Sequence, residues 1–162
     1  MKPKSPQTAS SLNMRSIFRC MMEDGYYPVF EKTHIQFGMD EHIGIVEYDE
    51  GIVSVRLFFS IDEEAYDLFM EASNLTMLDT YTVKSAILDD MTNIMFSCEI
   101  MCDNLREFRK FFPRAVDRLS EALVTHKAEM KKLILANEVV SRTIPATEES
   151  MAGISKTRKI LS

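Results

Sequence analysis

The chain has 162 residues, of which 46% are hydrophobic, and a formal net charge of −6 at pH 7. This length and composition are typical of one globular domain with a buried core. They exclude a membrane-spanning helix, which needs about 18 continuous apolar residues, and the basic, proline-containing residues 1–7 do not resemble a secretory signal. We therefore expect a cytoplasmic protein.

Charge is distributed unevenly along the chain. Residues 15–140 contain 13 Lys and Arg against 23 Asp and Glu, a net charge of −10, whereas the two ends together carry +4. A strongly acidic body repels nucleic acids and anionic membrane surfaces. We expect neither as a partner.

The chain divides into three segments. Residues 1–10 are expected to form a disordered amino-terminal segment, and residues 11–140 a single α+β domain. Apolar periodicity fades from residue 141 onward into Thr, Ser, Pro and Gly, with a basic end, which is the composition of a mobile tail. Residues 141–162 are predicted to form that tail.

The first predicted element is an amphipathic helix. Ser10 or Ser11 can cap it, and Gly25 can end it. Between them, apolar residues recur at steps of three and four residues: Met14, Ile17, Phe18 and Met21.

Three strands are predicted next, over residues 35–39, 43–48 and 53–61. The residues Asp49-Glu50-Gly51 have the composition of a hairpin turn between the second and third of these strands. One face of the third strand is formed by alternating apolar residues: Val53, Val55, Leu57, Phe59 and Ile61.

A second helix is predicted to begin at Asp62, which sits where a cap belongs. A hairpin follows, with strands over residues 82–88 and 94–102 joined at Asp89-Asp90. The apolar face of its second strand is expected to contain Ile94, Phe96, Cys98, Ile100 and Cys102.

The third helix is expected to be capped by Asp103 and to carry an apolar stripe from Leu105 to Ile134. Pro113 interrupts this stripe, so we expect a kink or a restart there. If the helix does not bend at Pro113, its end near Met130 and Ile134 projects and needs cover from another subunit or from the tail.

The α-β-β-β-α-β-β-α order predicts an α+β fold, an antiparallel sheet with its helices packed mainly on one face.

No catalytic, cofactor-binding or metal site is predicted. His34, His42 and His126 lie on different elements, and none has an acid or Cys at ligand spacing. Phosphate-binding glycine motifs and the G-x-S-x-G motif are missing from the sequence. An enzymatic role would need a cleft that gathers these histidines with carboxylates from distant segments.

The cysteines and acidic clusters have structural explanations. Cys20, Cys98 and Cys102 form no C-x-x-C motif, and the latter two share a strand face where they can pack as small apolar residues. The acidic runs at 62–64 and 89–90 could be metal carboxylates, but helix capping and turn formation already account for them.

A basic ridge is predicted on the third helix, because four cations are spaced four residues apart: Arg106, Lys110, Arg114 and Arg118. A solvated surface is one interpretation, favoured by the neighbouring Asp117 and Glu121. Binding of an anion or nucleic acid is the other.

The second helix carries apolar residues on two sides. Its inward stripe centres on Ala65 and Ala72, and a second stripe contains Tyr66, Met70, Ser73 and Met77. This second stripe can pack on the end of the same core or on the first helix. Alternatively, Tyr66, Met70 and Met77 form a homodimer interface, which is the hypothesis we pursue.

The outward face of the sheet also contains apolar residues. Ile52 and Phe58 oppose the core face of their strand, as do Met95 and Met101 on theirs. Apolar residues on a sheet face that no helix covers suggest a docking surface or a covering loop. We therefore predict a partner-binding surface formed by Ile52, Phe58, Met95 and Met101.

The order of elements resembles that of the type III secretion chaperones and the related bacterial sensory-transduction-regulator family. The resemblance covers roughly residues 11–135, including the segments IVSVRLFFSIDEEAYDLFMEAS and NLREFRKFFPRAVDRLSEAL. It implies a non-enzymatic α+β domain that dimerises, commonly through the middle helix, and binds protein segments along its sheet. Tyr66, Met70 and Met77 match the position of that helix contact.

Two functions therefore follow from the sequence. The first is a non-enzymatic, dimeric protein-binding or chaperone-like module with a protein or peptide partner. The alternative is a small-ligand-binding or regulatory sensor domain, which requires an apolar pocket between sheet and helices. Neither function requires a cofactor.

Overall fold

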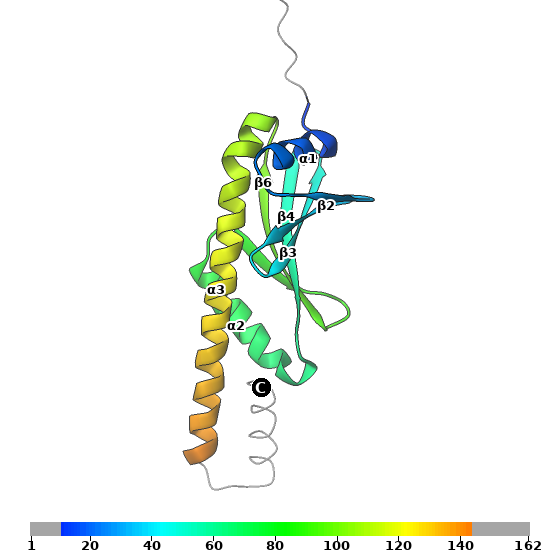
Figure 1. Cartoon of the computed structure of the whole chain (residues 1–162). Coiled ribbons are helices and arrows are strands. Elements are labelled where there is room, and N and C mark those ends of the chain that lie inside the picture. Colours follow the sequence, from blue (N-terminus) through cyan, green and yellow to red (C-terminus); the bar gives the residue numbers. More distant parts are fainter. Residues whose placement is uncertain (1–10, 144–162) are drawn as a thin grey trace, which may run out of the picture.

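The computed structural model of the protein describes residues 11–143 and has the predicted α+β fold. The helices are α1 (Met14–Glu23), α2 (Tyr66–Asp79), which follows a short 3₁₀ turn (Glu63–Ala65), and α3 (Leu105–Thr143). The strands are β1 (Val29–Glu31), β2 (His34–Met39), β3 (His42–Asp49), β4 (Ile52–Ser60), β5 (Val83–Ile87) and β6 (Asn93–Met101). Figure 1 shows α3 extending past the twisted sheet and alongside α2.

The predictions for the two ends of the chain lie largely outside the described residues. Only residues 141–143 of the predicted tail are described, and they belong to the last turn of α3. Between residues 11 and 143, no helix combines the length and apolar character that crossing a membrane requires.

Helix α1 begins at a different cap from the one predicted. The Asn13 side chain accepts a hydrogen bond from the Ser16 N–H at 3.0 Å, and the Ser16 hydroxyl accepts one from the Asn13 N–H at 3.0 Å. This reciprocal capping box satisfies two backbone donors at once, so it displaces Ser11 as the cap. The predicted stop is confirmed, because Gly25 follows the helix with a φ of +83°.

All six strands pair in one antiparallel sheet, in the order β1-β2-β3-β4-β6-β5. The five predicted strands are present. Strand β1 was not predicted, because three exposed residues show no alternation of apolar and polar side chains. It lies at one edge of the sheet, and β5 lies at the other.

The predicted hairpin between β3 and β4 is confirmed. The register pairs Asp49 with Ile52, which leaves Glu50 and Gly51 as a two-residue loop. Both loop residues have positive φ angles, +43° and +87°. This geometry matches the right-handed twist of the paired strands, and the glycine adopts it without strain.

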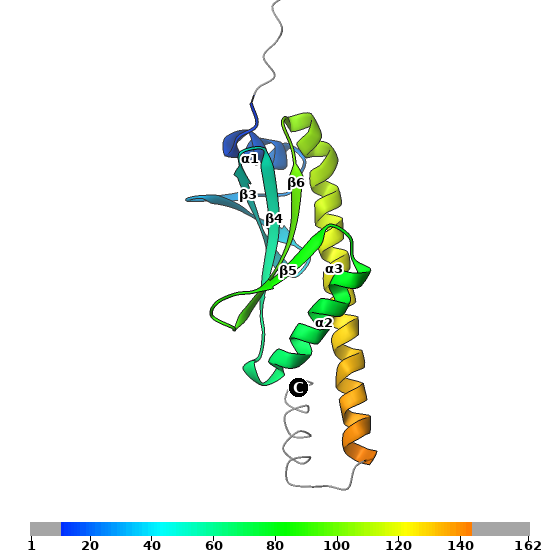
Figure 2. The same ribbon diagram turned by 180° about the vertical axis from the view of Figure 1, so that it is seen from behind.

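The helices cover one face of the sheet, as predicted. The covered face contains Val53, Val55 and Leu57 of β4 and Ile94, Phe96 and Cys98 of β6, all of which are buried. Phe108, Phe112 and Leu119 of α3 pack into the same core. Figure 2 shows from behind how α2 and α3 lie beside the sheet.

Helix α3 is a single element of 39 residues, which at 1.5 Å per residue spans about 58 Å. It continues through Pro113, so the predicted restart at this residue is wrong. Its cap is also one residue later than predicted: the Asn104 side chain accepts from the Glu107 N–H at 3.0 Å. Asp103 instead donates its own N–H to the Glu107 carboxylate at 2.8 Å.

Helix α2 packs against α3 near Met130 and Ile134. The predicted helix cap, Asp62, caps the preceding 3₁₀ turn instead: its side chain accepts a hydrogen bond from the Glu64 N–H at 3.1 Å, whereas α2 begins after Ala65 without a side-chain cap. A second buried cluster then joins Ala72 of α2 to Met130 and Ile134 of α3. The cover that the sequence analysis assigned to another subunit or to the tail is thus provided by α2 of the same chain.

Candidate interaction surface

Helix α1 presents two different faces. Ile17, Cys20 and Met21 are buried in the core beneath α3. Residues spaced three and four apart lie together on another side of the helix. This second set contains Arg15, Phe18, Arg19 and Met22. One face of α1 therefore holds the domain together, and the other is available for contact.

The second face of α1 forms a groove with strand β1. Its four side chains and Phe30 line a pocket of about 380 Å³, which we call the α1–β1 groove. The rings of Phe18 and Phe30 pack edge to face with centroids 5.8 Å apart. Met22 is 54% exposed and Phe30 is 42% exposed. An exposed apolar surface bordered by charged residues is typical of a binding site.

The groove lies at a free edge of the sheet. Among residues 11–143, strand β1 pairs with β2 alone, and its three residues are exposed. Tyr27 and Val29 add exposed apolar surface to the same segment. A free edge strand offers backbone N–H and C=O groups to another chain. Because β1 is short and follows Pro28, it can supply few such hydrogen bonds.

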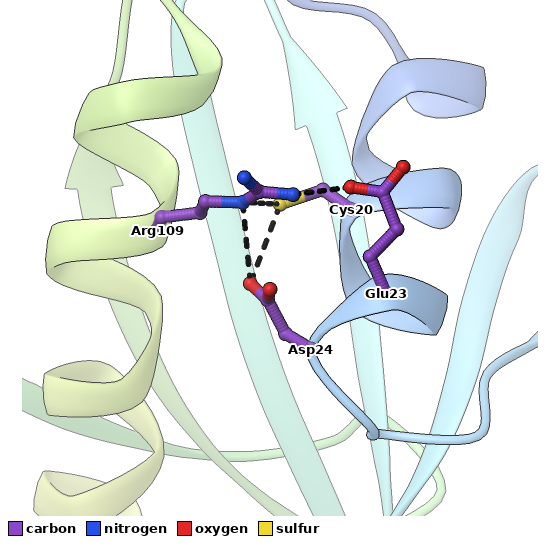
Figure 3. Close-up of polar contacts among 4 residues, drawn as sticks. All are labelled: Cys20, Glu23, Asp24 and Arg109. Atoms are coloured by element: carbon purple, nitrogen blue, oxygen red, sulfur yellow. Dashed lines mark hydrogen bonds and ion pairs between the residues drawn. The ribbon is translucent and has the colours of Figure 1, made fainter.

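A polar cluster anchors the end of α1 to α3 (Figure 3). Arg109 of α3 donates to the Cys20 Sγ at 3.1 Å and forms ion pairs with Glu23 and with Asp24, the latter at 3.4 Å. Glu23 lies four residues after Arg19 and could have neutralised it. Since Arg109 engages Glu23, Arg19 has no ion pair with any other described residue.

The three thiols are packing groups. Burial raises the pKa of Cys20 and of Cys98, and it raises the pKa of Cys102 to about 11. The thiolate is the reactive form of cysteine, and a raised pKa reduces its population at neutral pH. The predicted packing role of Cys98 and Cys102 is confirmed, since both belong to the core.

The predicted dimer residues occupy two environments. Tyr66 and Met77 are partly buried and pack against the core of their own chain, whereas Met70 is 36% exposed. Ser73, in the same stripe, donates to the Ser85 hydroxyl of β5 at 2.8 Å. Part of the stripe therefore packs within its own chain, and Met70 remains exposed to solvent. Two further apolar residues near the end of α2 are exposed, Leu78 and Tyr81.

The predicted partner-binding surface on the open sheet face is divided. The register places Ile52 beside Met101 and Phe58 beside Met95. The two pairs lie six positions apart along β4, a distance of about 20 Å. Two ion pairs of 2.6 Å lie on this face, Arg56 with Glu47 and Lys84 with Glu99. The four residues do not form one continuous apolar surface.

The histidines remain apart. His34 contacts the Gln36 side chain at 3.1 Å, and His42 lines a surface pocket of about 260 Å³. In that pocket the Ser120 hydroxyl donates to the Asp40 carboxylate at 3.2 Å. Within residues 11–143, no group of three or more His, Cys, Asp or Glu side chains is placed to hold a metal ion.

His126 is the most deeply buried histidine, with 3% of its surface exposed. Its ring lies 5.4–5.6 Å from the rings of Phe59, Phe69 and Phe96, and its Nε2 has no hydrogen-bond partner. Burial lowers the pKa of His126, although a backbone hydrogen bond at Phe69 opposes this effect. The neutral ring therefore acts as part of the core.

The basic ridge of α3 is partly neutralised. Arg118 pairs with Glu121 at 2.7 Å. Lys110 and Arg114 lie 5.2 and 6.0 Å from the centroid of the Phe111 ring. Such cation–π contacts fit an exposed helix face and require no bound anion.

The space between the sheet and α3 is filled by side chains. Phe96, Phe108 and Phe112 are each exposed by 1% or less, and the rings of the latter two stack at 4.8 Å. A sensor domain requires a pocket in this position. The observed packing therefore favours binding at the surface over binding in the interior.

Comparisons with known proteins establish the fold alone. YbjN from E. coli, a candidate transcription regulator, has a TM-score of 0.61 at 9% identity, over 75% of this chain and 94% of YbjN. An uncharacterized protein from Methanothermobacter thermautotrophicus has a TM-score of 0.55 at 14% identity, over 75% and 98% of the two chains. No family model matches the chain, and no curated protein does. The chain thus shares its fold with these two proteins, and the link to type III secretion chaperones stays a prediction.

Proposed function

We propose that this protein is a non-enzymatic, chaperone-like module that binds a segment of another polypeptide in the α1–β1 groove. The observation that carries the proposal is the exposed apolar groove of about 380 Å³ beside a free sheet edge. Both features are typical of surfaces that receive an extended chain. The description of YbjN as a candidate regulator is compatible with a protein that acts through a partner.

The proposal includes a homodimer formed through α2. Met70, Leu78 and Tyr81 are exposed on or just beyond this helix, while Tyr66 and Met77 already contact the core. A second copy would remove these exposed side chains from water, at about 25 cal/mol per Å² before the costs of association. We also place the protein in the cytoplasm, where free thiols such as those of the buried cysteines stay reduced.

Site-specific cross-linking tests the binding function. A photoreactive amino acid is placed at Met22 in the groove, and in a matched variant at Met101, which is 83% exposed on the open sheet face. Illumination in the native host should join the Met22 variant to a polypeptide, and mass spectrometry should locate the attachment. Cross-links from Met101 alone would contradict the assignment of the groove.

Light scattering tests the dimer. Met70→Glu places a carboxylate at an apolar contact, twice over if the interface is symmetric, so the variant should become monomeric. Val124→Glu is the matched control, because Val124 is 69% exposed on α3 and its variant should keep the wild-type mass. A wild-type protein that is monomeric at tens of micromolar would refute the dimer, as would a dimeric Met70→Glu variant.

A further inference from the structure

We propose that the segment bound in the α1–β1 groove is an extended chain in which large apolar residues alternate with acidic ones. This inference rests on the proposed binding function and specifies its partner. The apolar part of the pattern follows from the lining of the groove, where Phe18, Met22 and Phe30 surround the pocket. The acidic part follows from the charges around it.

Two arginines border the groove without counter-ions. Arg15 and Arg19 lie on the same side of α1 as Phe18 and Met22, and neither forms an ion pair with another described residue. Glu23 and Asp24, the nearest carboxylates along the helix, are held by Arg109 (Figure 3). Because Arg109 holds Glu23, Arg19 is left without the carboxylate four residues after it. A guanidinium group matches a carboxylate in shape and can bind it through two hydrogen bonds.

The charge of the surrounding chain makes this border unusual. Residues 20–104 contain three basic and 18 acidic residues. An acidic partner is therefore repelled by this part of the chain and attracted by the basic residues of α1 and α3, and of these Arg15 and Arg19 line the α1–β1 groove. The first ten residues of the protein carry Lys2 and Lys4 and no acidic residue, so they are a poor occupant of the same site.

The sheet edge favours an extended conformation. An added strand could pair with β1, and its alternate side chains would then point to the side of Phe30. Because β1 has only three residues, backbone pairing alone is insufficient and the side chains must supply the rest of the contact. An alternating sequence satisfies both conditions, with apolar residues toward the groove and carboxylates within reach of the arginines.

Fluorescence anisotropy with synthetic peptides tests the inference. The probe is a labelled seven-residue peptide in which Leu and Phe alternate with Asp and Glu, and its counterpart has Lys at every acidic position. The acidic probe should bind at least about tenfold more tightly than the Lys probe at low salt, because two exposed charge pairs favour it. This preference should shrink as the salt concentration rises, since salt screens exposed charges.

Two variants locate the interaction. Arg15→Gln combined with Arg19→Gln should remove the preference for the acidic probe, and Met22→Gln, which replaces an apolar contact without adding a charge, should weaken binding of both probes. Arg106→Gln combined with Arg114→Gln is the control, because these exposed cations lie on α3 away from the groove lining. Circular dichroism and the melting temperature verify that each variant is folded.

The outcomes separate the inference from the binding function. Equal affinity for both probes, with weaker binding of both in Met22→Gln, would overturn the acidic preference and leave the groove as a binding site. If the acidic probe does not bind but a photoreactive group at Met22 still cross-links to a polypeptide, the acidic preference is likewise wrong and the groove remains a binding site. If no probe binds and no cross-link forms at Met22, both proposals are wrong. Acidic-probe binding that the control variant abolishes would assign the surface to α3 instead.

Discussion

Helix α3 is joined to α1 and to α2 in different ways. Near α1, exposed charged groups lie around Arg109, above a buried contact made by Ile17 and Met21. Near α2, the contact is apolar, with Ala72 against Met130 and Ile134. The first junction combines a buried face with a polar surface, whereas the second is almost entirely buried.

This difference explains why the two helices are available for different tasks. Exposed ion pairs contribute little to stability because water and salt screen them, so burial of one face fixes α1 on the domain. Its other face is then free to carry the α1–β1 groove without weakening the fold. Helix α2 packs against both the sheet core and α3, and its exposed side includes Met70 and Leu78.

The largest effect is expected when the buried face of α1 is changed. Ile17 is fully buried, so Ile17→Ala should lower the free energy of unfolding by about 2–5 kcal/mol, since it removes apolar contact and leaves a cavity. Met22→Ala, on the exposed face, should change it by less than about 0.5 kcal/mol. Urea denaturation measures both. If the two substitutions lowered the free energy of unfolding equally, the two faces of α1 would contribute equally to stability, contrary to this prediction.

An intermediate effect is expected at the α2 junction when pH is lowered. His126 is buried among aromatic rings with a pKa below its usual value, so the folded protein resists protonation that the unfolded chain accepts near pH 6.5. The effect of His126 on the free energy of unfolding should be absent above pH 6.5, where the ring is neutral in both the folded and the unfolded protein. The free energy of unfolding should fall by up to about 1.4 kcal/mol per pH unit below that value, until the folded protein also takes up the proton.

Comparison with His126→Phe isolates this contribution, because other groups titrate in the same range. The variant keeps an aromatic ring among Phe59, Phe69 and Phe96 but has no proton to accept. Its unfolding free energy should therefore depend less on pH between 6.5 and 5. Parallel curves for wild type and His126→Phe would contradict the prediction.

Most of the fold could be predicted because periodicity reflects burial directly. Val53, Val55 and Leu57 alternate along β4 and are all buried, and Gly51 marks a turn that needs positive φ. Capping was less predictable. Ser11 and Asn13 are both good caps, and the choice depended on whether Ser16 could complete a reciprocal pair.

The candidate site was harder to predict, because it depends on contacts between distant residues. The apolar stripe that the sequence predicts for the first helix includes Phe18 and leaves out Met22. The spacing of Arg15, Phe18, Arg19 and Met22 is a readable signal of a second face. The contribution of Phe30 to the groove cannot be read from the sequence, because β1 shows no pattern of apolar and polar residues. The ion pair between Glu23 and Arg109 cannot be read either, because the two residues are 86 positions apart.

The smallest effect on global stability is expected from Arg109→Gln, which removes the polar part of the α1 junction. The apolar contact remains, so the midpoint of urea denaturation should stay within the scatter of surface substitutions, such as Arg114→Gln. The local effect should be clear, because Arg109 is the group that ties Cys20, Glu23 and Asp24 to α3. Amide hydrogen exchange should become faster near residues 20–25 and stay unchanged in β4 and β6. A loss of global stability as large as that of Ile17→Ala would show instead that the polar cluster, and not the buried face, holds α1 in place.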